Sequence, residues 1–358
     1  IMTKNRKFLA LAAQIVAVLA ILVTLSLCFV GCNGDVDPDA PPVDFDRDDL
    51  GRQPEEASIQ GATAIDSTQV TATSAELSTD EAVKASAAYL LNLANANLVK
   101  VDYYANYAVG GGTADVTSLS MAGDMKVREV RIKDGAAMYM VTLGRVTNGY
   151  VIGNNTDPVA PIISLCRTIL DYGNRKYTPD GKTMYVQEGG TSCLTEKSVA
   201  NFYTDQPYID WDKCGKVKAE SIEDFMKNEY YRNHYFETNS SLINAQNLVN
   251  ASVVHNEELG CYEIEMTVDV NSNALELATE STRESAGSKD IVFVYQTIIC
   301  EIWDCGLFRT YETADSWSGS MGGGILKGAS ENTWEKYFTY NKDNAPGLQI
   351  PTDMTWYK

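Results

Sequence analysis

The side chains that most often catalyse reactions or bind metals are sparse in this sequence. It contains only two histidines, His234 and His255. His234 lies in an aromatic run and His255 ends an expected strand, and neither has the neighbours of a metal-ligand or nucleophile motif. We therefore expect both to be packing or surface residues, and the pattern disfavours a zinc hydrolase.

The motifs of serine acylation and nucleotide hydrolysis are also missing. No Gly-x-Ser-x-Gly, Ser-x-x-Lys or Gly-x-x-x-x-Gly-Lys pattern occurs. The glycine runs at 110–112 and 322–324 lack an adjoining Lys and Ser or Thr, so they predict turns or bulges. Acidic residues are abundant, which leaves a carboxylate pair for glycoside cleavage open as a minor alternative. The sequence predicts no catalytic residue and no cofactor.

One acidic run is similar to a calcium loop. Asp210, Asp212 and Gly215 match the first, third and sixth places of an EF-hand loop. Cys214 occupies the fifth place and Ser221 the twelfth, where a Glu is required. A solvated acidic loop and no metal site are therefore predicted.

Tyrosine is the residue type most compatible with ligand binding. The chain has 20 tyrosines, which include Tyr103, Tyr104, Tyr107, Tyr230, Tyr231 and Tyr235. A tyrosine can line an apolar groove while its hydroxyl meets a polar head group. The alternative is ordinary cross-strand packing. Both interpretations stay open, and no ligand-binding residue is singled out.

The amino-terminal residues have the order of an export signal. Lys4, Arg6 and Lys7 precede an apolar stretch that runs from Phe8 to Val30. Because about 20 apolar residues cross a bilayer core, an uncleaved membrane anchor is the alternative to a cleaved signal. Both interpretations place the following residues outside the cytoplasm.

The end of this stretch decides between the two. Residues 29–32, Phe-Val-Gly-Cys, resemble the lipobox of bacterial lipoproteins, although Phe29 replaces the usual Leu. Cys28 fits less well because the bulky Leu27 precedes it. We predict a signal peptide over 1–31 and lipidation of Cys32. The lipid anchor would hold the protein at the extracytoplasmic face of the cell membrane.

Composition divides the remaining chain into a spacer and a domain. Over 32–78, clustered Asp and Pro residues precede a run of Ser, Thr, Ala and Gln that cannot bury enough apolar area to fold. We predict a disordered linker there and a β-rich lipoprotein domain over 79–358. The net charge of −19 would repel nucleic acid, so no nucleic-acid partner is expected.

Six cysteines follow the lipobox, namely Cys166, Cys193, Cys214, Cys261, Cys300 and Cys305. Outside the cytoplasm they would form up to three disulfides, and in a protein from an anaerobe they would be half-buried thiols. The sequence favours neither. Cys300 and Cys305 are not expected to pair, because five extended residues span roughly 16 Å and a disulfide holds Cα atoms roughly 6 Å apart.

The hydrophobic periodicity changes from helical to strand-like after Leu98. A helix is expected from about Ser78, and strands are expected over 99–109 and 114–131. Lys133-Asp134-Gly135 predicts a turn before a third strand. Later strands are expected at 184–186, 261–270, 291–303, 307–317 and 333–340, and later helices at 159–172, 221–231 and 273–286. The predicted fold class is α+β, a curved antiparallel sheet (an unclosed β-barrel) with helices packed on one face.

Three of these features together resemble uncharacterised lipoproteins of Gram-positive, clostridial type. They are the turn at 133–135, the strand at 262–269 followed by a helix with Gly287, and the hairpin at 302–307. The likeness covers roughly 80–341. At the level of fold, the order of strand, helix and strand also resembles outer-membrane lipoprotein carriers and mycobacterial glycolipid-binding lipoproteins.

In those carrier families, helices plug an unclosed β-barrel that holds acyl chains. The resemblance therefore implies a hydrophobic or amphiphilic ligand in a half-barrel groove. Because a fold does not establish a function, a second hypothesis is kept. It is a non-catalytic envelope scaffold or adhesion module that binds a protein or glycan partner.

Overall fold

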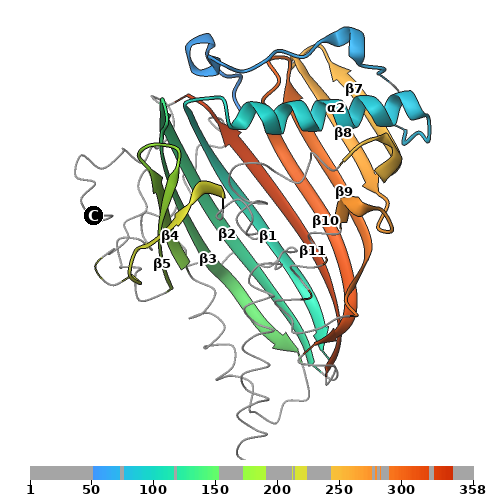
Figure 1. The fold of residues 1–358 in the computed structure, drawn as a ribbon. Helices are drawn as coiled ribbons and strands as arrows, with labels where there is room; N and C mark the ends of the chain where they lie inside the picture. The colour runs from blue at the N-terminus through green and yellow to red at the C-terminus, as the bar shows by residue number, and fades with distance from the viewer. Residues whose placement is uncertain are drawn as a thin grey trace, which may run out of the picture.

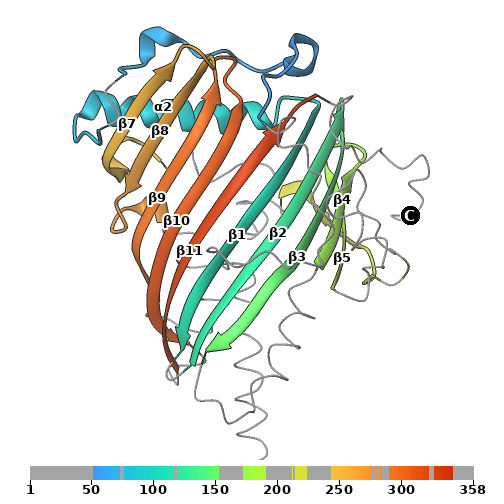
Figure 2. The same cartoon turned by 180° about the vertical axis from the view of Figure 1, so that it is seen from behind.

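The computed structural model describes residues 51–72, 76–116, 119–152, 172–190, 212, 214–223, 243–275, 279, 283, 290–321 and 326–341. Most of them form one antiparallel sheet of 11 strands. The sheet is not closed, and it curves toward the side that carries the long helix (Figures 1 and 2). The predicted open, curved antiparallel sheet is confirmed.

The strands are β1 (Tyr103–Val116), β2 (Leu119–Asp134), β3 (Ala137–Ile152), β4 (Tyr172–Thr178), β5 (Thr183–Gly190), β6 (Lys218–Ser221), β7 (Leu248–Asn256), β8 (Cys261–Val268), β9 (Val292–Trp303), β10 (Phe308–Met321) and β11 (Leu326–Thr339). Their spatial order is β6-β5-β4-β3-β2-β1-β11-β10-β9-β8-β7. The first and last strands therefore pair in the middle of the sheet, and they join two meanders (Figure 1). β6 and β7 form the two edges.

The predicted hairpin turns are confirmed. Gly135 and Gly306 have φ values of 58° and 80°, a left-handed conformation that residues with a Cβ rarely adopt. At the turn between β4 and β5, the Asp180 carboxylate accepts hydrogen bonds from the backbone of Lys182 (2.8 Å) and Thr183 (3.0 Å). These turns set the register of the long hairpins.

The strands at the centre of the sheet are longer than the sequence predicts. β11 pairs with β1 from Ala105↔Thr339 to Val116↔Gly328, so its first half, at residues 326–332, is also strand. The glycines at 110–112 lie inside β1, so the prediction of a turn or bulge there is wrong. A Cβ at Gly110 would lie 2.8 Å from Cε3 of Trp334, and the glycine thus makes room for that indole.

One α-helix, α2 (Glu81–Leu98), crosses one face of the sheet (Figure 1). The carboxylate of Asp80 accepts a hydrogen bond from the backbone N–H of Ala82 (2.8 Å) and caps the helix. The expected apolar positions are all buried, namely Val83, Ala87, Leu90, Leu91 and Ala94. The predicted helix is confirmed.

The structure describes the other predicted helices only in part. Residues 159–171 lie outside the described residues. Ser221, the predicted N-cap, is the last residue of β6, and residues 222 and 223 after it are helical, as predicted. Residues 224–231 lie outside the described residues. At 273–286, Asn273–Leu275 forms a 3-10 helix and residues 279 and 283 are helical. Within the described part of the chain, only α2 packs on the sheet as a long helix.

The predicted linker contains a segment that packs on the domain. Gly51 donates a backbone hydrogen bond to Phe338 (3.2 Å), and Ile65 donates one to Asp304 (3.1 Å). One 3-10 helix, Glu56–Ile59, lies between these two anchor points. A second, Ser67–Gln69, lies between Ile65 and α2. The prediction of disorder is wrong for residues 51–72, because composition does not reveal backbone contacts to distant residues. Residues 32–50 lie outside the described residues.

Ser78, between this segment and α2, covers part of an edge of the sheet. Ser78 and Ala251 of β7 exchange both backbone hydrogen bonds, at 2.7 and 2.9 Å. An uncovered edge strand offers unpaired backbone groups to other chains, and this bridge satisfies part of that edge. α2 begins three residues later, at Glu81.

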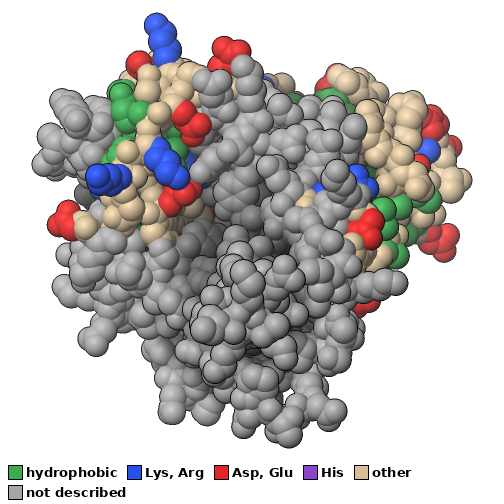
Figure 3. Space-filling model, turned by 60° about the horizontal axis from the view of Figure 1, so that its bottom comes forward, with side chains coloured by type: hydrophobic (Ala, Val, Ile, Leu, Met, Phe, Trp, Pro, Cys, Tyr) green, Lys and Arg blue, Asp and Glu red, His purple; other side chains and the backbone are tan. Residues whose placement is uncertain are grey.

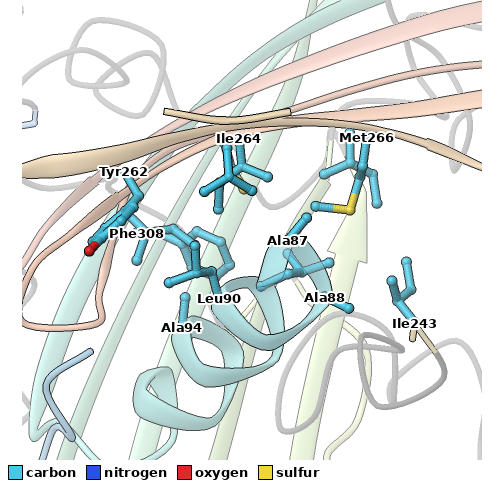
Figure 4. Close-up of a cluster of buried hydrophobic side chains, with 14 of the residues drawn as sticks. Ala87, Ala88, Leu90, Ala94, Ile243, Tyr262, Ile264, Met266 and Phe308 are labelled. Atoms are coloured by element: carbon cyan, nitrogen blue, oxygen red, sulfur yellow. The ribbon is translucent and has the colours of Figure 1, made fainter. Parts of the chain in front are cut away.

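The main hydrophobic core lies between α2 and the strands from β7 to β10. Ile264 and Met266 of β8 point toward Ala87 and Leu90 of the helix (Figure 4). Small alanines on this helix face let the backbone of α2 lie close to the sheet. The burial of every second residue of β8 confirms the predicted alternation.

The register of the strands assigns each side chain to a face. Side chains alternate along a strand, and residues paired across strands share a face. We call the face that carries α2 the inner face and the opposite one the outer face (Figure 2). Tyr104 belongs to the core under α2, so its partner Arg131 also lies on the inner face.

Candidate functional site

A group of polar side chains lies on the inner face beside the core. Tyr104 donates a hydrogen bond from its hydroxyl to Oε1 of Glu129 (2.8 Å), and Asn106 donates one to the same oxygen (3.0 Å). All three side chains are buried. Together with three cations that interact with Glu129, we call this group the Glu129 cluster. Its members are Tyr104, Asn106, Glu129, Arg131, Lys176 and Lys336.

Arg131 is held by the end of α2. Its guanidinium donates hydrogen bonds to the carbonyl oxygens of Leu98 and Val101, the second at 2.7 Å. Its Cζ lies 4.5 Å from the ring centroid of Tyr104, a cation–π distance. Nε of Arg131 is buried and has no hydrogen-bond partner among the described residues. Burial lowers the pKa of Arg131, while the charge of Glu129 opposes that shift.

The two lysines approach Glu129 from other strands. Lys176 lies on β4, and Lys336 lies on β11 with Nζ 5.8 Å from the ring centroid of Tyr311. Burial lowers the pKa of Lys176 well below its usual value and also lowers the pKa of Lys336. The negative charge of Glu129 opposes both shifts. Glu129 is therefore a counter-charge that the buried Arg131 and Lys176 share with the half-buried Lys336.

The positive charges of these side chains are opposite in sign to the net charge of the molecule. Acidic side chains are spread over both sides of the described surface in a view from the lower end (Figure 3), and the chain carries −19. An anionic group inside the half-barrel would meet these three cations, although Glu188 and Glu220 also act on Lys176.

A second polar group lies further along the inner face, on β9 to β11. Asn332 donates a hydrogen bond to Oδ1 of Asp315 (2.7 Å) and accepts one from the hydroxyl of Ser330 (2.8 Å). Burial raises the pKa of Asp315 to about 6, although the Asn332 hydrogen bond opposes the shift. Gln296 and Trp317 are the neighbours of Asp315 and Ser330 in the sheet. Within the described part of the chain, each has a buried polar atom without a hydrogen-bond partner.

Aromatic rings connect the apolar and polar parts of the inner face. The ring centroid of Phe338 lies 5.4 Å from that of Phe308 and 6.4 Å from that of Tyr104. Phe308 belongs to the core under α2, and Tyr104 belongs to the Glu129 cluster. Tyr311 and Trp334 are half-buried on the same face of β10 and β11.

The structure divides the predicted tyrosines between the two faces. Tyr104 is the inner-face tyrosine of β1, whereas Tyr103 and Tyr107 alternate with it and face outward. Tyr103 packs with Ala105 and residues of β2, as the packing interpretation predicts, and burial raises its pKa to about 12. Tyr230, Tyr231 and Tyr235 lie outside the described residues.

His255 lies at the end of the edge strand β7. Its Nε2 is 3.0 Å from Oδ1 of Asp304, and its ring centroid is 4.5 Å from that of Tyr262. Both members of the His255–Asp304 pair are partly exposed, so His255 is a surface residue as predicted. His234 lies outside the described residues.

The predicted acidic loop around Asp212 joins the sheet through its backbone. Gly215 donates a hydrogen bond to the carbonyl of Glu188 (2.9 Å). In the described ranges, no group of three or more His, Cys, Asp or Glu side chains is placed to hold a metal ion. Asp210 lies outside those ranges.

The described cysteines are of two kinds. Cys214 is disulfide-bonded, whereas Cys261, Cys300 and Cys305 are free. Three bridges are therefore not formed, and Cys300 and Cys305 do not pair, as predicted. Burial raises the pKa of the Cys261 thiol to about 11 and also raises that of Cys300. Buried thiols of this kind are poor nucleophiles.

Sequence reasoning missed the Glu129 cluster. Residues 126–133 read Lys-Val-Arg-Glu-Val-Arg-Ile-Lys, in which charged residues fall on both faces of the strand. Such a run is typical of a solvated strand. The burial of Glu129 and Arg131 is evident only in the folded sheet, where β1 lies between β2 and the distant strand β11. The periodicity itself carried no signal for this site.

No protein-family model matches the sequence, and no curated protein matches it. Among the described residues, no helix is long and apolar enough to cross a membrane. Cys32 and the residues before it lie outside that description.

Proposed function

We propose that this protein is an exported cell-surface lipoprotein whose half-barrel binds an amphiphilic ligand on its inner face. One observation carries the proposal: an apolar core and a buried charged cluster lie side by side on one curved face. Phe338 is buried and contacts both parts, so the two are continuous. A ligand would reach this junction along the half-buried rings of Tyr311 and Trp334. Ligand sites commonly combine an apolar lining with a few placed polar groups.

The charge of the cluster favours an anionic head group. Arg131, Lys176 and Lys336 surround Glu129, while Glu188 and Glu220 also act on Lys176, and burial lowers the pKa of each cation. A carboxylate or phosphate brought beside them would stabilise their charged forms and raise those pKa values again. The apolar tail would then extend along the half-buried rings of Tyr311 and Trp334.

The proposed location rests on the amino-terminal residues alone. A signal peptide cleaved before Cys32 and a diacylglycerol on its sulfur would place the domain outside the membrane. Intact-mass measurement of the membrane-extracted protein should show a chain that begins at Cys32 and carries acyl chains. An unmodified Cys32 in a cytosolic product would reject this part of the proposal.

We infer a binding role rather than a catalytic one. The sequence lacks the motifs of serine acylation, nucleotide hydrolysis and zinc catalysis. The buried groups described above are compatible with holding a ligand in place. A turnover assay with glycosides would test the carboxylate-pair alternative directly.

Co-purification tests the proposed ligand. The full chain is extracted from its own membrane in a mild detergent and analysed by native mass spectrometry and by solvent extraction. Wild type should carry an amphiphile that Lys336→Glu loses, because the new carboxylate repels an anionic head group. Lys126→Glu is the matched control, since Lys126 is half-buried on the outer face of β2.

Loss from both variants, or only detergent in all three preparations, would contradict the proposal. Retention in Lys336→Glu would show that the ligand does not use this cluster. Native mass spectrometry also reports whether each variant is folded, because unfolded chains carry a broad distribution of higher charges.

A further inference from the structure

Exposed apolar side chains concentrate on one strand of the outer face. Of the seven large hydrophobic residues that are exposed in the described part of the chain, four lie on β9. They are Val292 (48% exposed), Val294 (56%), Tyr295 (37%) and Ile299 (40%). Scattered exposed residues are ordinary, whereas a contiguous group on one strand is typical of an interaction site.

Carboxylates flank this strand on both sides. Ile299 is paired with Glu265 of β8 and with Glu312 of β10, and Glu312 is paired with Glu335 of β11. Register therefore places all four residues in one row across the outer face, with about 4.8 Å between neighbouring strands. One apolar side chain thus lies between carboxylates in this row.

These carboxylates have no basic partner in the part of the chain that the structure describes. Among the described residues, none of Glu265, Glu312 and Glu335 forms a salt bridge. Glu335 accepts a hydrogen bond from the hydroxyl of Tyr337. The next row differs, because there Glu301 is paired with Arg309. The pKa of Glu312 is raised by partial burial and by the charges of Glu335 and Glu265.

From this surface we infer that the outer face of β8–β11 docks a cationic amphipathic polypeptide, whose Lys or Arg residues meet the carboxylates and whose aliphatic residues cover β9. Opposite charge across an interface speeds association and selects the partner. Helical residues three and four apart lie about 5–6 Å from each other, which suits the spacing of the row.

A second copy of this chain is a poor occupant. A two-fold contact through this face would bring the same carboxylates of both copies together, on molecules that each carry −19. An anionic lipid surface would be repelled for the same reason. The inference does not rest on the ligand proposed for the inner face, because the two surfaces lie on opposite sides of the sheet.

A designed peptide tests the surface. The full chain is held in zwitterionic nanodiscs, and empty nanodiscs are the blank. The probe is a labelled helical peptide of about 18 residues with Lys and Leu on one face and Ala and Gln on the other. We expect saturable binding to wild type that added salt weakens. Ile299→Ser and the pair Glu312→Gln/Glu335→Gln should each raise the Kd about tenfold.

The turn between β7 and β8 supplies matched controls. Leu259 is 40% exposed, like Ile299, and Glu257 and Glu258 are exposed beside it. Leu259→Ser and the pair Glu257→Gln/Glu258→Gln should leave the Kd unchanged, because this turn lacks the flat row of the sheet.

Several outcomes would overturn the inference. They are no binding above the blank, equal weakening by the control variants, and equal binding of a peptide in which Glu replaces Lys. Sedimentation of wild type as a dimer that Ile299→Ser dissociates would also overturn it, because the occupant would then be a second copy. None of these results bears on ligand loss from Lys336→Glu.

Discussion

The two ends of the inner face are built in opposite ways. Under α2, the face consists of aliphatic and aromatic side chains that are buried against the helix. A short distance along the same sheet, buried side chains are charged and form hydrogen bonds around Glu129. The register of β1 with β2 and β11 places both regions on one continuous surface.

The two regions contribute differently to the free energy of folding. Burying a large apolar side chain stabilises the fold by about 1.5–3 kcal/mol. Burying a charge costs several kcal/mol unless a counter-charge and hydrogen bonds offset it. The α2 core therefore stabilises the domain, whereas the Glu129 cluster is retained at a cost in folding free energy. A role in binding would explain that cost.

The largest effect is expected in the α2 core. Leu90→Ala removes a fully buried side chain at the centre of the helix face and should lower the free energy of unfolding by about 2–5 kcal/mol. Urea denaturation checks this value. Leu77→Ala, at an exposed position before the helix, should change it by less than about 0.5 kcal/mol. Equal effects would refute the division between the two regions.

A smaller loss is expected when the shared counter-charge is removed. Glu129→Gln keeps an acceptor for Tyr104 and Asn106 but leaves three cations without their common carboxylate. We expect the free energy of unfolding to fall by about 2–3 kcal/mol. Adding Lys336→Met should recover part of this loss, since one cation is then gone. An additive double variant would contradict the coupling between the two residues.

The smallest effect is a gain in stability at Asp315. Its pKa is raised from 3.8 to about 6 in the folded state, so the folded state holds the proton more tightly than the unfolded state. The stability that wild type has below pH 3.8 is therefore lost as the pH rises to about 6. Asp315→Asn should stabilise the protein by about 1–3 kcal/mol at pH 7.5.

At pH 3.5 the same substitution should have little effect, because the carboxyl group is protonated in both states. Thermal unfolding of both proteins at the two pH values measures the difference. A gain that is equal at pH 3.5 and pH 7.5 would mean that the ionisation of Asp315 has no part in it.

The sequence predicted the strands and the helix that have one buried face and one face exposed to solvent. The alternation in β8 and the helical spacing of α2 are direct signals of that difference, and both are confirmed. The turn at Gly135 was predictable because turn chemistry is local. These elements account for the open antiparallel sheet that the sequence indicated.

The sequence could not predict contacts that depend on distant pairing. The meeting of β1 with β11 joins residues more than 200 positions apart, and it brings the half-buried Lys336 near Glu129. The docking of residues 51–72 is likewise set by backbone hydrogen bonds to Asp304 and Phe338. No periodicity within a segment reports such contacts.

Photocrosslinking tests most directly whether the inner face binds an amphiphile at the Glu129 cluster. A photoactivatable fatty acid is added to native membranes that contain the full chain, and crosslinked residues are located by mass spectrometry. We predict crosslinks on the inner face of β10 and β11, at Tyr311 and Trp334, that Lys336→Glu abolishes. Crosslinks confined to the amino-terminal anchor, or to outer-face residues such as Ile299, would contradict the account.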